Sequence, residues 1–168
     1  MIAKLIVEGK EFDIEILDPK LQELILPKKK TGYERLEDGD TFFYQSSDGG
    51  KTHGYDYYTE YADYHFATAN YYSSEKVAEN NIRADKLMRQ LRRFAVEHRT
   101  NELDWTYQVQ RKFYIYYGNR TKELLVGDNG TARDFGVIYF DSEKTAKLAI
   151  ETFRDELIWY FTEYKDSL

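Results

Sequence analysis

A long, basic and amphipathic segment constrains the fold of this chain more than any other feature. In residues 73–99 the apolar side chains recur at spacings of three and four, which gives an α-helix one face for burial. Between Arg83 and Arg99 the segment holds six lysines and arginines against two acids, although the whole chain has a net charge of −6. The sequence therefore predicts a long helix that buries one face and carries a basic stripe on another.

The composition is typical of one folded domain without disulfides. With 168 residues, of which 42% are hydrophobic and 32% charged, the chain is long enough to bury a sizeable core. Cysteine is absent, which excludes disulfides and thiolate metal sites and fits a reducing compartment. The sequence shows no signal-peptide pattern and no run of about 18 apolar residues. We therefore expect a single domain over residues 1–168, located in the cytoplasm of a host cell and not in a membrane.

Alternating apolar residues between turn-forming residues predict an α+β fold. The pattern indicates an N-terminal β-hairpin followed by two β-β-β-α units, with antiparallel sheets packed against two long helices. The hairpin covers residues 3–17, a short helix covers 19–25 and a basic linker covers 28–30. Further strands are expected at 31–36, 41–46, 51–58 and 64–72 before the basic helix, and at 105–117, 122–127 and 134–140 before a second helix from 143 to near 164.

Two octapeptides that lie 68 residues apart indicate an internal repeat. Residues 71–78 (YYSSEKVA) and 139–146 (YFDSEKTA) are identical at five of eight positions, and each lies where a strand is expected to lead into a helix. The repeat would cover residues near 31–99 and 105–165. The same match also follows from ordinary helix-start chemistry, so duplication and convergence both stay open at this point.

The predicted C-terminal helix has apolar residues on two sides. Most of them form one continuous face, whereas Leu148 and Trp159 lie on the opposite side. This second pair predicts a second contact, either with another layer of the same chain or with a second copy in a homo-oligomer.

The sequence lacks the motifs for catalysis and for metal or cofactor binding. Residues 49–52 (GGKT) lack the upstream glycine and the following helix of a phosphate-binding loop. The histidines His53, His65 and His98 do not have the spacing of metal ligands, and no Gly-x-Ser-x-Gly motif is present. We therefore predict no catalytic residues, no metal and no cofactor, and we do not expect an enzyme.

Binding of a nucleotide-type small molecule is the function that the basic helix favours. Guanidinium groups hold phosphate with paired hydrogen bonds, and aromatic rings on strands can stack on a base. The alternative is that the cations neutralise the acidic segment 34–63 inside the fold. The predicted ligand-binding residues are Arg83, Lys86, Arg89, Arg93, Tyr114, Tyr116 and Arg133.

The acidic segment 34–63 supports a different function. It holds eight acids against two bases, with several tyrosines between them. Carboxylates on exposed strands can imitate a phosphate backbone and bind the nucleic-acid groove of another protein. In this alternative Asp56, Glu60 and Asp63 form an acidic partner surface, whereas simple solvation of the surface would need no partner. Direct binding of nucleic acid is not expected for a chain with this net charge.

Four passages resemble a known group of proteins. They are residues 4–17 (KLIVEGKEFDIEIL), 27–35 (PKKKTGYER), 91–98 (LRRFAVEH) and 153–166 (FRDELIWYFTEYKD). Together they resemble small, largely uncharacterised proteins encoded by phages and prophages of Gram-positive bacteria (Firmicutes). The group contributes no catalytic motif, and small phage proteins of this type often counteract host defence.

This resemblance implies a phage counter-defence protein that binds and sequesters a nucleotide-derived immune signal, such as a cyclic nucleotide or an ADP-ribose derivative. The alternative is an inhibitor of the anti-CRISPR type, which would bind a host defence nuclease through its acidic segment. A third alternative is a phage structural or assembly factor.

Overall fold

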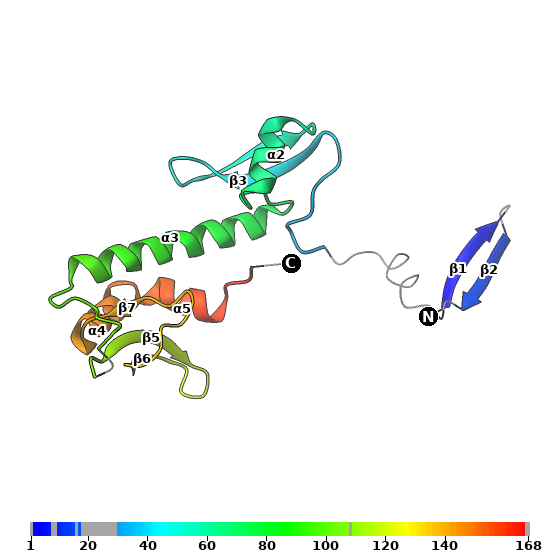
Figure 1. Ribbon diagram of the computed structural model, residues 1–168. Helices are drawn as coiled ribbons and strands as arrows, with labels where there is room; N and C mark the ends of the chain where they lie inside the picture. The colour runs from blue at the N-terminus through cyan, green and yellow to red at the C-terminus, as the bar shows by residue number, and fades with distance from the viewer. Residues whose placement is uncertain (1, 8–9, 16, 18–29, 108, 167–168) are drawn as a thin grey trace. The chain divides into compact units, whose positions relative to one another are not determined.

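The structure is a computed structural model that describes residues 2–7, 10–15, 17, 30–107 and 109–166. The chain divides into two compact units, Met1–Thr31 and Gly32–Leu168, and each is described by itself. Both strands and helices are present and the sheets are antiparallel, so the predicted α+β class is confirmed (Figure 1). One domain over the whole chain stays a prediction.

The first unit contains the predicted N-terminal hairpin. Strands β1 (Ile2–Val7) and β2 (Lys10–Glu15) pair antiparallel, and Val7 lies opposite Lys10. The ammonium of Lys4 lies 2.7 Å from the carboxylate of Glu11 across the two strands. The hairpin prediction is therefore confirmed, whereas the predicted helix at 19–25 and most of the linker at 28–30 lie outside the described residues.

The second unit begins with a small lobe, residues 32–74, which we call the first lobe. Strands β3 (Asp40–Gln45) and β4 (Lys51–Asp56) form an antiparallel hairpin. Side-chain alternation directs Phe42 toward helix α2 (Glu60–Ala67), where it is fully buried with Ala62 and Tyr71. Phe43 points to the other side of the hairpin and packs against Tyr72 and Val77 at the start of the next helix.

Two strand predictions in the first lobe are wrong. Residues 31–36 have no regular structure, and residues 64–72 contain the end of α2 and a single β-bridge between Tyr72 and Phe43. The spacing of the tyrosines in residues 57–72 also fits the period of two of a β-strand. However, Thr59 caps a helix there by accepting a hydrogen bond from the amide of Ala62. Burial of Ala62 and His65 on one helix face then decides the period.

Helix α3 (Glu75–Glu97) connects the first lobe to a second lobe formed by residues 99–166, and it confirms the predicted basic helix (Figure 1). Ser74 accepts a hydrogen bond from the amide of Val77 and caps the first turn. The first half of α3 packs on Phe43, and the second half packs on the helices and strands of the second lobe. The residues of α3 in this larger core are Leu87, Leu91, Phe94 and Ala95.

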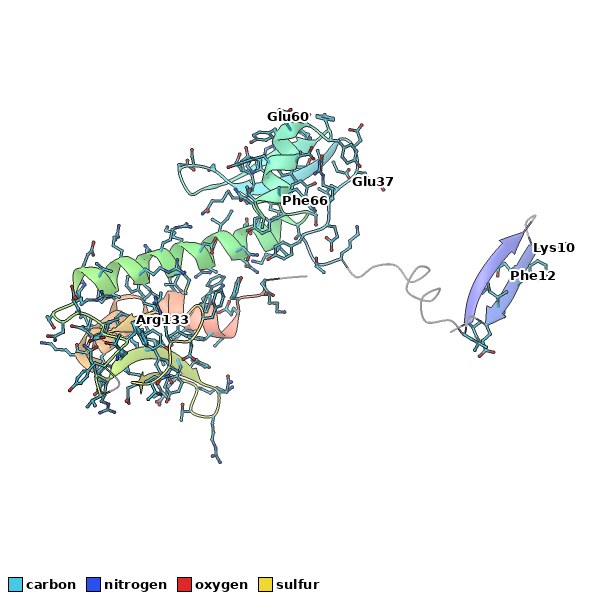
Figure 2. The ribbon with its side chains drawn as sticks, viewed as in Figure 1. Lys10, Phe12, Glu37, Glu60, Phe66 and Arg133 are labelled. Carbon is cyan, nitrogen blue, oxygen red and sulfur yellow. The ribbon has the colours of Figure 1, made fainter. Side chains whose placement is uncertain are left out.

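The second lobe is a three-stranded antiparallel sheet with two helices. Its strands β5 (Lys112–Gly118), β6 (Glu123–Asn129) and β7 (Tyr139–Phe140) have the order β6-β5-β7, and α4 (Glu143–Thr152) and α5 (Arg154–Thr162) follow. Regular pairing begins only at Lys112, so the predicted strands at 105–117 and 134–140 are too long. Figure 2 labels Arg133 in this lobe and Glu60 and Phe66 on α2.

The predicted C-terminal helix is two helices. The backbone breaks at Phe153, whose ring packs edge-on against Phe94 of α3 with the centroids 5.5 Å apart. The break turns α5 so that Trp159 packs within the fold, whereas Leu148 on α4 stays 41% exposed. These two residues therefore do not form one exposed surface, and a homo-oligomer stays a prediction.

The two segments of the internal repeat share the pairing order of their strands, although α2 of the first segment has no counterpart between β6 and β7 of the second. In each, a hairpin is followed by a residue pair that bonds to the first hairpin strand, as in Phe43 with Tyr72 and Phe113 with Phe140. Each then enters a helix through a capping serine, Ser142 in the second case. Common strand order and capping support the repeat, although its origin by duplication stays a prediction.

Gly32 is predicted to be intolerant of any side chain. Its φ is +95°, and an added Cβ would lie 2.6 Å from Cγ2 of Val77 in the core of the first lobe. We expect Gly32→Ala to lower the free energy of unfolding by about 2–4 kcal/mol, because backbone strain and overpacking add. Gly49→Ala is the matched control, since Gly49 has a φ of +86° and open space around it. Urea unfolding of both variants measures the difference, and equal losses would contradict the steric explanation.

Candidate functional site

A cleft lined by arginines lies between the end of α3 and the segment that precedes β7. It has a volume of about 440 Å³, and a neighbouring hollow of about 430 Å³ shares two of its arginines. Three parts of the chain supply its walls: the last turns of α3, residues 103–105, and residues 133–139. We call it the arginine cleft, and its principal side chains are Arg92, Arg99, Trp105 and Arg133.

Trp105 is the aromatic centre of the arginine cleft. Its ring packs edge-on against Tyr139 with the centroids 4.9 Å apart, and the guanidinium carbon of Arg133 lies 5.5 Å from its centroid. The ammonium of Lys112 lies 5.2 Å from the same ring and donates a 3.0 Å hydrogen bond to the carbonyl of Tyr107. Because Lys112 is fully buried, it adds a fixed positive charge behind the tryptophan.

The arginines of the arginine cleft lack ion pairs, as do Arg89, Arg120 and Arg154 elsewhere in the described part of the chain. Arg92, Arg99 and Arg133 make no ion pair with any residue in the described part of the chain. By contrast, Arg111 forms two hydrogen bonds with the carboxylate of Asp128, at 2.8 and 2.6 Å. No described carboxylate forms an ion pair with these three arginines, so the potential in the cleft is positive. A positive potential favours an anionic ligand.

Tyr139 holds the wall that carries Arg133. Its hydroxyl donates a 2.8 Å hydrogen bond to the carboxylate of Asp134 and accepts one from the Asp134 amide. Burial and the Asp134 carboxylate raise the pKa of Tyr139, and the bond from the Asp134 amide opposes them. Tyr139 is therefore a neutral donor at physiological pH, and it fixes the segment between Arg133 and β7.

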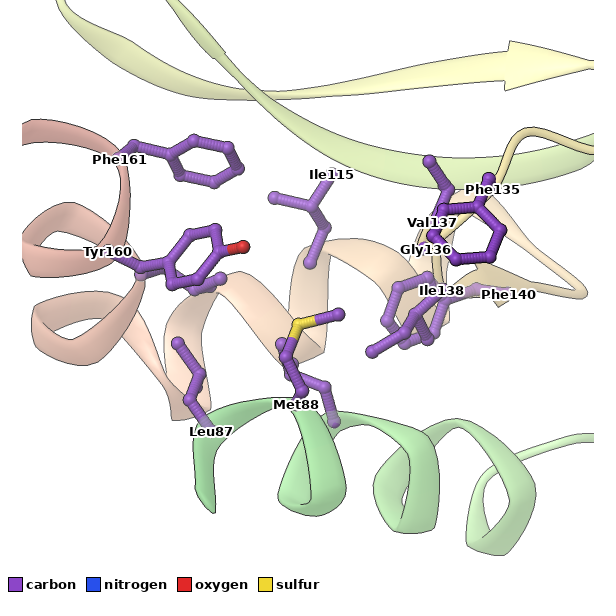
Figure 3. Close-up of a pocket in the computed structure, with 12 residues that line it drawn as sticks. Leu87, Met88, Ile115, Phe135, Gly136, Val137, Ile138, Phe140, Tyr160 and Phe161 are labelled. Atoms are coloured by element: carbon purple, nitrogen blue, oxygen red, sulfur yellow. The ribbon is translucent and has the colours of Figure 1, made fainter. Parts of the chain in front are cut away.

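An apolar pocket adjoins the arginine cleft across residues 135–138. It has a volume of about 300 Å³ and lies between α3, α5 and β5 (Figure 3). Met88, Ile115 and Tyr160 point into it from these three elements, as Figure 3 shows. Phe135 lies at its edge with a fully exposed side chain. Only residues 135–138 would thus separate an anionic group in the arginine cleft from an apolar group in this pocket.

The predicted basic stripe of α3 does not form one site. Arg83 donates two hydrogen bonds to the Glu156 carboxylate, at 2.8 and 3.1 Å, and its guanidinium lies 3.9 Å from the ring centroid of Trp159. Lys86 lines a separate hollow beside Arg83, Arg89 is exposed, and Arg93 pairs with Glu97 on its own helix at 3.6 Å. Arg83 and Arg93 therefore pair with carboxylates of the fold, but with Glu156 and Glu97 and not with the acidic segment 34–63 that the alternative named.

Tyr114 and Tyr116 lie on the sheet face that points away from α3. Alternation along β5 directs Phe113 and Ile115 into the core, so the two tyrosines point to the opposite side. Tyr114 nevertheless contacts Tyr139, with the centroids 5.9 Å apart, and Tyr139 contacts Trp105. The structure therefore connects Tyr114 with Arg133 through two aromatic rings, but it does not bring either tyrosine to the basic stripe.

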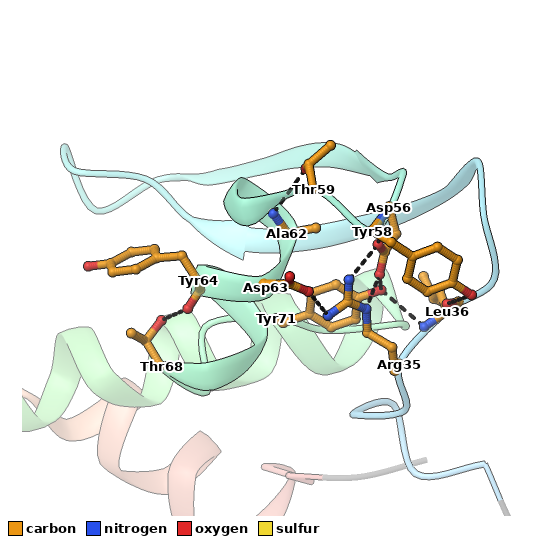
Figure 4. Close-up of polar contacts among 10 residues, drawn as sticks. All are labelled: Arg35, Leu36, Asp56, Tyr58, Thr59, Ala62, Asp63, Tyr64, Thr68 and Tyr71. Carbon is orange, nitrogen blue, oxygen red and sulfur yellow. Dashed lines mark hydrogen bonds and ion pairs between the residues drawn. The ribbon is translucent and has the colours of Figure 1, made fainter.

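Asp56 is misplaced in the predicted acidic partner surface. Its carboxylate is fully buried, where it accepts a 2.8 Å hydrogen bond from Arg35 and a 2.7 Å bond from the hydroxyl of Tyr71 (Figure 4). Asp63 is exposed but accepts a 2.8 Å hydrogen bond from the same Arg35. Glu60 is exposed. Asp56 therefore has a structural role, and only Glu60 and Asp63 of the predicted set reach the surface.

Sequence reasoning missed Arg92, Arg99, Trp105 and Lys112. A signal for two of them was present, because Arg92 and Arg99 are seven residues apart within the predicted helix, although α3 itself ends at Glu97. No local pattern marks Trp105 or Lys112, since the contacts of Trp105 with Arg133, Tyr139 and Lys112 depend on tertiary packing.

Arg83 is expected to act in stability and not in ligand binding. We predict that Arg83→Met lowers the free energy of unfolding by about 1–2 kcal/mol, because a cation-π contact and a half-exposed ion pair are lost together. Lys86→Met is the control, with an expected effect below about 0.5 kcal/mol, because Lys86 has no ion pair with a described residue. Chemical unfolding measures both, and a stronger effect of Lys86→Met would contradict the assignment.

The comparisons with known proteins assign no family. No protein-family model matches the chain, and searches among curated proteins and solved structures found no match either. None of the described helices is both long and apolar enough to cross a membrane. Within the same described residues, no group of histidine and acidic side chains could hold a metal ion.

Proposed function

We propose that this protein is a non-enzymatic binding protein that holds a nucleotide-type ligand in the arginine cleft. The observation that carries the proposal is the set of three arginines without ion pairs around Trp105. Guanidinium groups of this kind bind phosphate through paired, charge-assisted hydrogen bonds. The predicted class of ligand is kept, and its predicted site moves from the outer stripe of α3 to this cleft.

The proposed pose places the ligand across the arginine cleft and the apolar pocket. The phosphate groups contact Arg92, Arg99 and Arg133, and the buried charge of Lys112 strengthens the potential at the cleft. The base enters the apolar pocket of about 300 Å³ beside residues 135–138, which is large enough for one aromatic ring system. A ligand with an anionic end and a flat apolar end would therefore bind better than inorganic phosphate.

The biological context of the proposal comes from the resemblance to phage and prophage proteins. In that context the ligand is a nucleotide-derived immune signal, such as a cyclic nucleotide or an ADP-ribose derivative. The protein would act as a sponge that lowers the free concentration of the signal, a function that needs affinity and abundance but no catalytic group.

A thermal-shift screen tests the proposal. The panel contains cyclic mono-, di- and oligonucleotides and ADP-ribose derivatives, with inorganic phosphate and ATP as controls. A ligand at one hundred times its dissociation constant adds about 2.7 kcal/mol, which raises the Tm of a domain of this size by several degrees. A selective shift with unchanged ligand recovered by chromatography is the expected result. Flat curves over the whole panel, or a chemically altered ligand, would contradict it.

A further inference from the structure

The solvent side of α2 is unusually aromatic for a helix of eight residues. The helix buries Ala62 and His65, and its other side carries large rings. Tyr64 is 66% exposed, Tyr61 is 50% exposed and Phe66 is 43% exposed. Exposed aromatic residues in this density are typical of interaction surfaces. We call this surface the α2 face, and it consists of Glu60, Tyr61, Asp63, Tyr64 and Phe66.

The α2 face is held rigidly by the buried groups beneath it. The hydroxyl of Tyr61 donates a hydrogen bond to the hydroxyl of Tyr44 on β3. Just before the helix, Tyr58 has a φ of +50°, which is uncommon for a bulky residue, and its amide donates a 3.0 Å hydrogen bond to Asp56. Because the ring of Tyr61 is held in place before any partner arrives, its ordering would add little to the entropic cost of binding.

The charge of the first lobe is strongly negative around this surface. Its two cations are both engaged, Arg35 by Asp56 and Asp63, and Lys51 by two glutamates of α3. Five of its carboxylates make no ion pair with any residue that the structure describes, and these are Glu37, Asp38, Asp40, Asp48 and Glu60. A positively charged partner therefore complements this lobe.

Arg35 shows how the first lobe already binds a guanidinium group. The guanidinium carbon lies 5.3 Å from the ring centroid of Tyr58 and 5.4 Å from that of Phe66. Carboxylates of Asp56 and Asp63 accept its hydrogen bonds at 2.8 Å (Figure 4). The α2 face presents the same combination, a carboxylate beside exposed rings, to the solvent. It therefore has the chemistry to bind further arginines from outside.

We propose that the α2 face docks onto an arginine-rich surface of a partner protein. The inference is independent of the nucleotide proposal, because it uses different residues on a different lobe. It differs from the predicted nucleic-acid mimic in two respects: Asp56 has no part in it, and the exposed rings contribute alongside the carboxylates through contacts with guanidinium planes.

The probe for this proposal is a fluorescent nona-arginine peptide, and the readouts are anisotropy and amide shifts of the ¹⁵N-labelled full chain. We expect binding that shifts the amides of residues 57–67 and weakens steeply between 50 and 500 mM salt, roughly as screening predicts. Tyr64→Ala with Glu60→Lys should lower the affinity at least tenfold. The matched control is Tyr107→Ala with Glu102→Lys, which changes an exposed tyrosine and an exposed acid elsewhere and should stay within twofold.

Two further measurements keep the test decisive. Glu60→Gln alone changes only an exposed side chain, and it should weaken binding about threefold if the double variant does not fold. A nona-lysine peptide should bind more weakly, because lysine lacks the planar group that stacks on rings. Amide shifts concentrated outside residues 57–67, an unchanged affinity of a folded double variant, or equal affinity for both peptides would overturn the proposal.

Discussion

Replacement of Asp56 by alanine is expected to lower the free energy of unfolding by about 3–5 kcal/mol, because it removes the buried carboxylate that Arg35 bonds to and leaves Arg35 only the exposed Asp63. The carboxylate is fully buried and accepts hydrogen bonds from Arg35, from the hydroxyl of Tyr71 and from the amide of Tyr58. All three donors lose their acceptor at once. Urea unfolding followed by circular dichroism measures the change.

Asp63→Ala is the matched control for Asp56→Ala. Asp63 bonds to the same Arg35, but its side chain is 61% exposed, so its removal should lower stability by at most about 1 kcal/mol. Similar losses in the two variants would show that burial of Asp56 does not determine its energetic role.

The stabilisation by Asp56 is also expected to depend on pH. Burial raises the pKa of Asp56, but the hydrogen bonds from Arg35, Tyr71 and the Tyr58 amide outweigh it, so the net pKa lies below the ordinary value. A depressed pKa in the folded state means that the carboxylate stabilises the fold fully above the unfolded pKa of about 3.9. The stability difference between wild type and Asp56→Ala should therefore be constant near neutral pH and shrink as the pH falls below 4. A difference that grows in acid would contradict this sign.

Reversal of two charges in the arginine cleft, by Arg92→Glu with Arg133→Glu, is expected to lower the affinity for the ligand found in the screen at least a hundredfold. Each charge-assisted hydrogen bond contributes about 1.5–3 kcal/mol, and the introduced carboxylates also repel phosphate. Neither arginine has an ion pair within the described residues, so the fold should tolerate the changes. Isothermal titration calorimetry gives the affinities.

The control for this experiment is Arg89→Glu with Arg93→Glu. It changes the net charge by the same amount on the same helix, and Arg89 and Arg93 do not line the arginine cleft. We expect a loss below about threefold, since exposed charges outside the cleft are screened by salt. If this control lost as much affinity as the cleft variant, the original basic stripe would be the binding site and the arginine cleft would not.

Local signals predicted the elements of this fold well. Ser74 and Ser142 both cap helices at the junctions that the octapeptide match indicated, and α3 lies within two residues of the predicted span. The error at residues 64–72 arose because closely spaced aromatic residues fit two periods at once. The contacts that chose the helix, between α2 and Phe42, come from a strand some twenty residues away in the chain.

The arginine cleft was less predictable than the fold. Arg133 was found from its place before a strand, but the arginines that share its cleft were not, and Arg83 was chosen although it serves packing. The arginines differ in whether a distant carboxylate pairs with them. Arg83 bonds to Glu156, which is 73 residues distant in sequence, and no pattern within α3 reports that pairing.

The sequence by itself determined the α+β class, the hairpins, the helix starts after Ser74 and Ser142 and the concentration of charge, because these depend on neighbours within a few positions. Only the tertiary structure decided which charges are used within the fold. Asp56 and Arg83 are paired across long separations, whereas Arg92, Arg99 and Arg133 converge on Trp105 without such partners. The physical reason is that such long-range ion pairs form only where two distant segments meet, and no local pattern in the sequence reports which segments do.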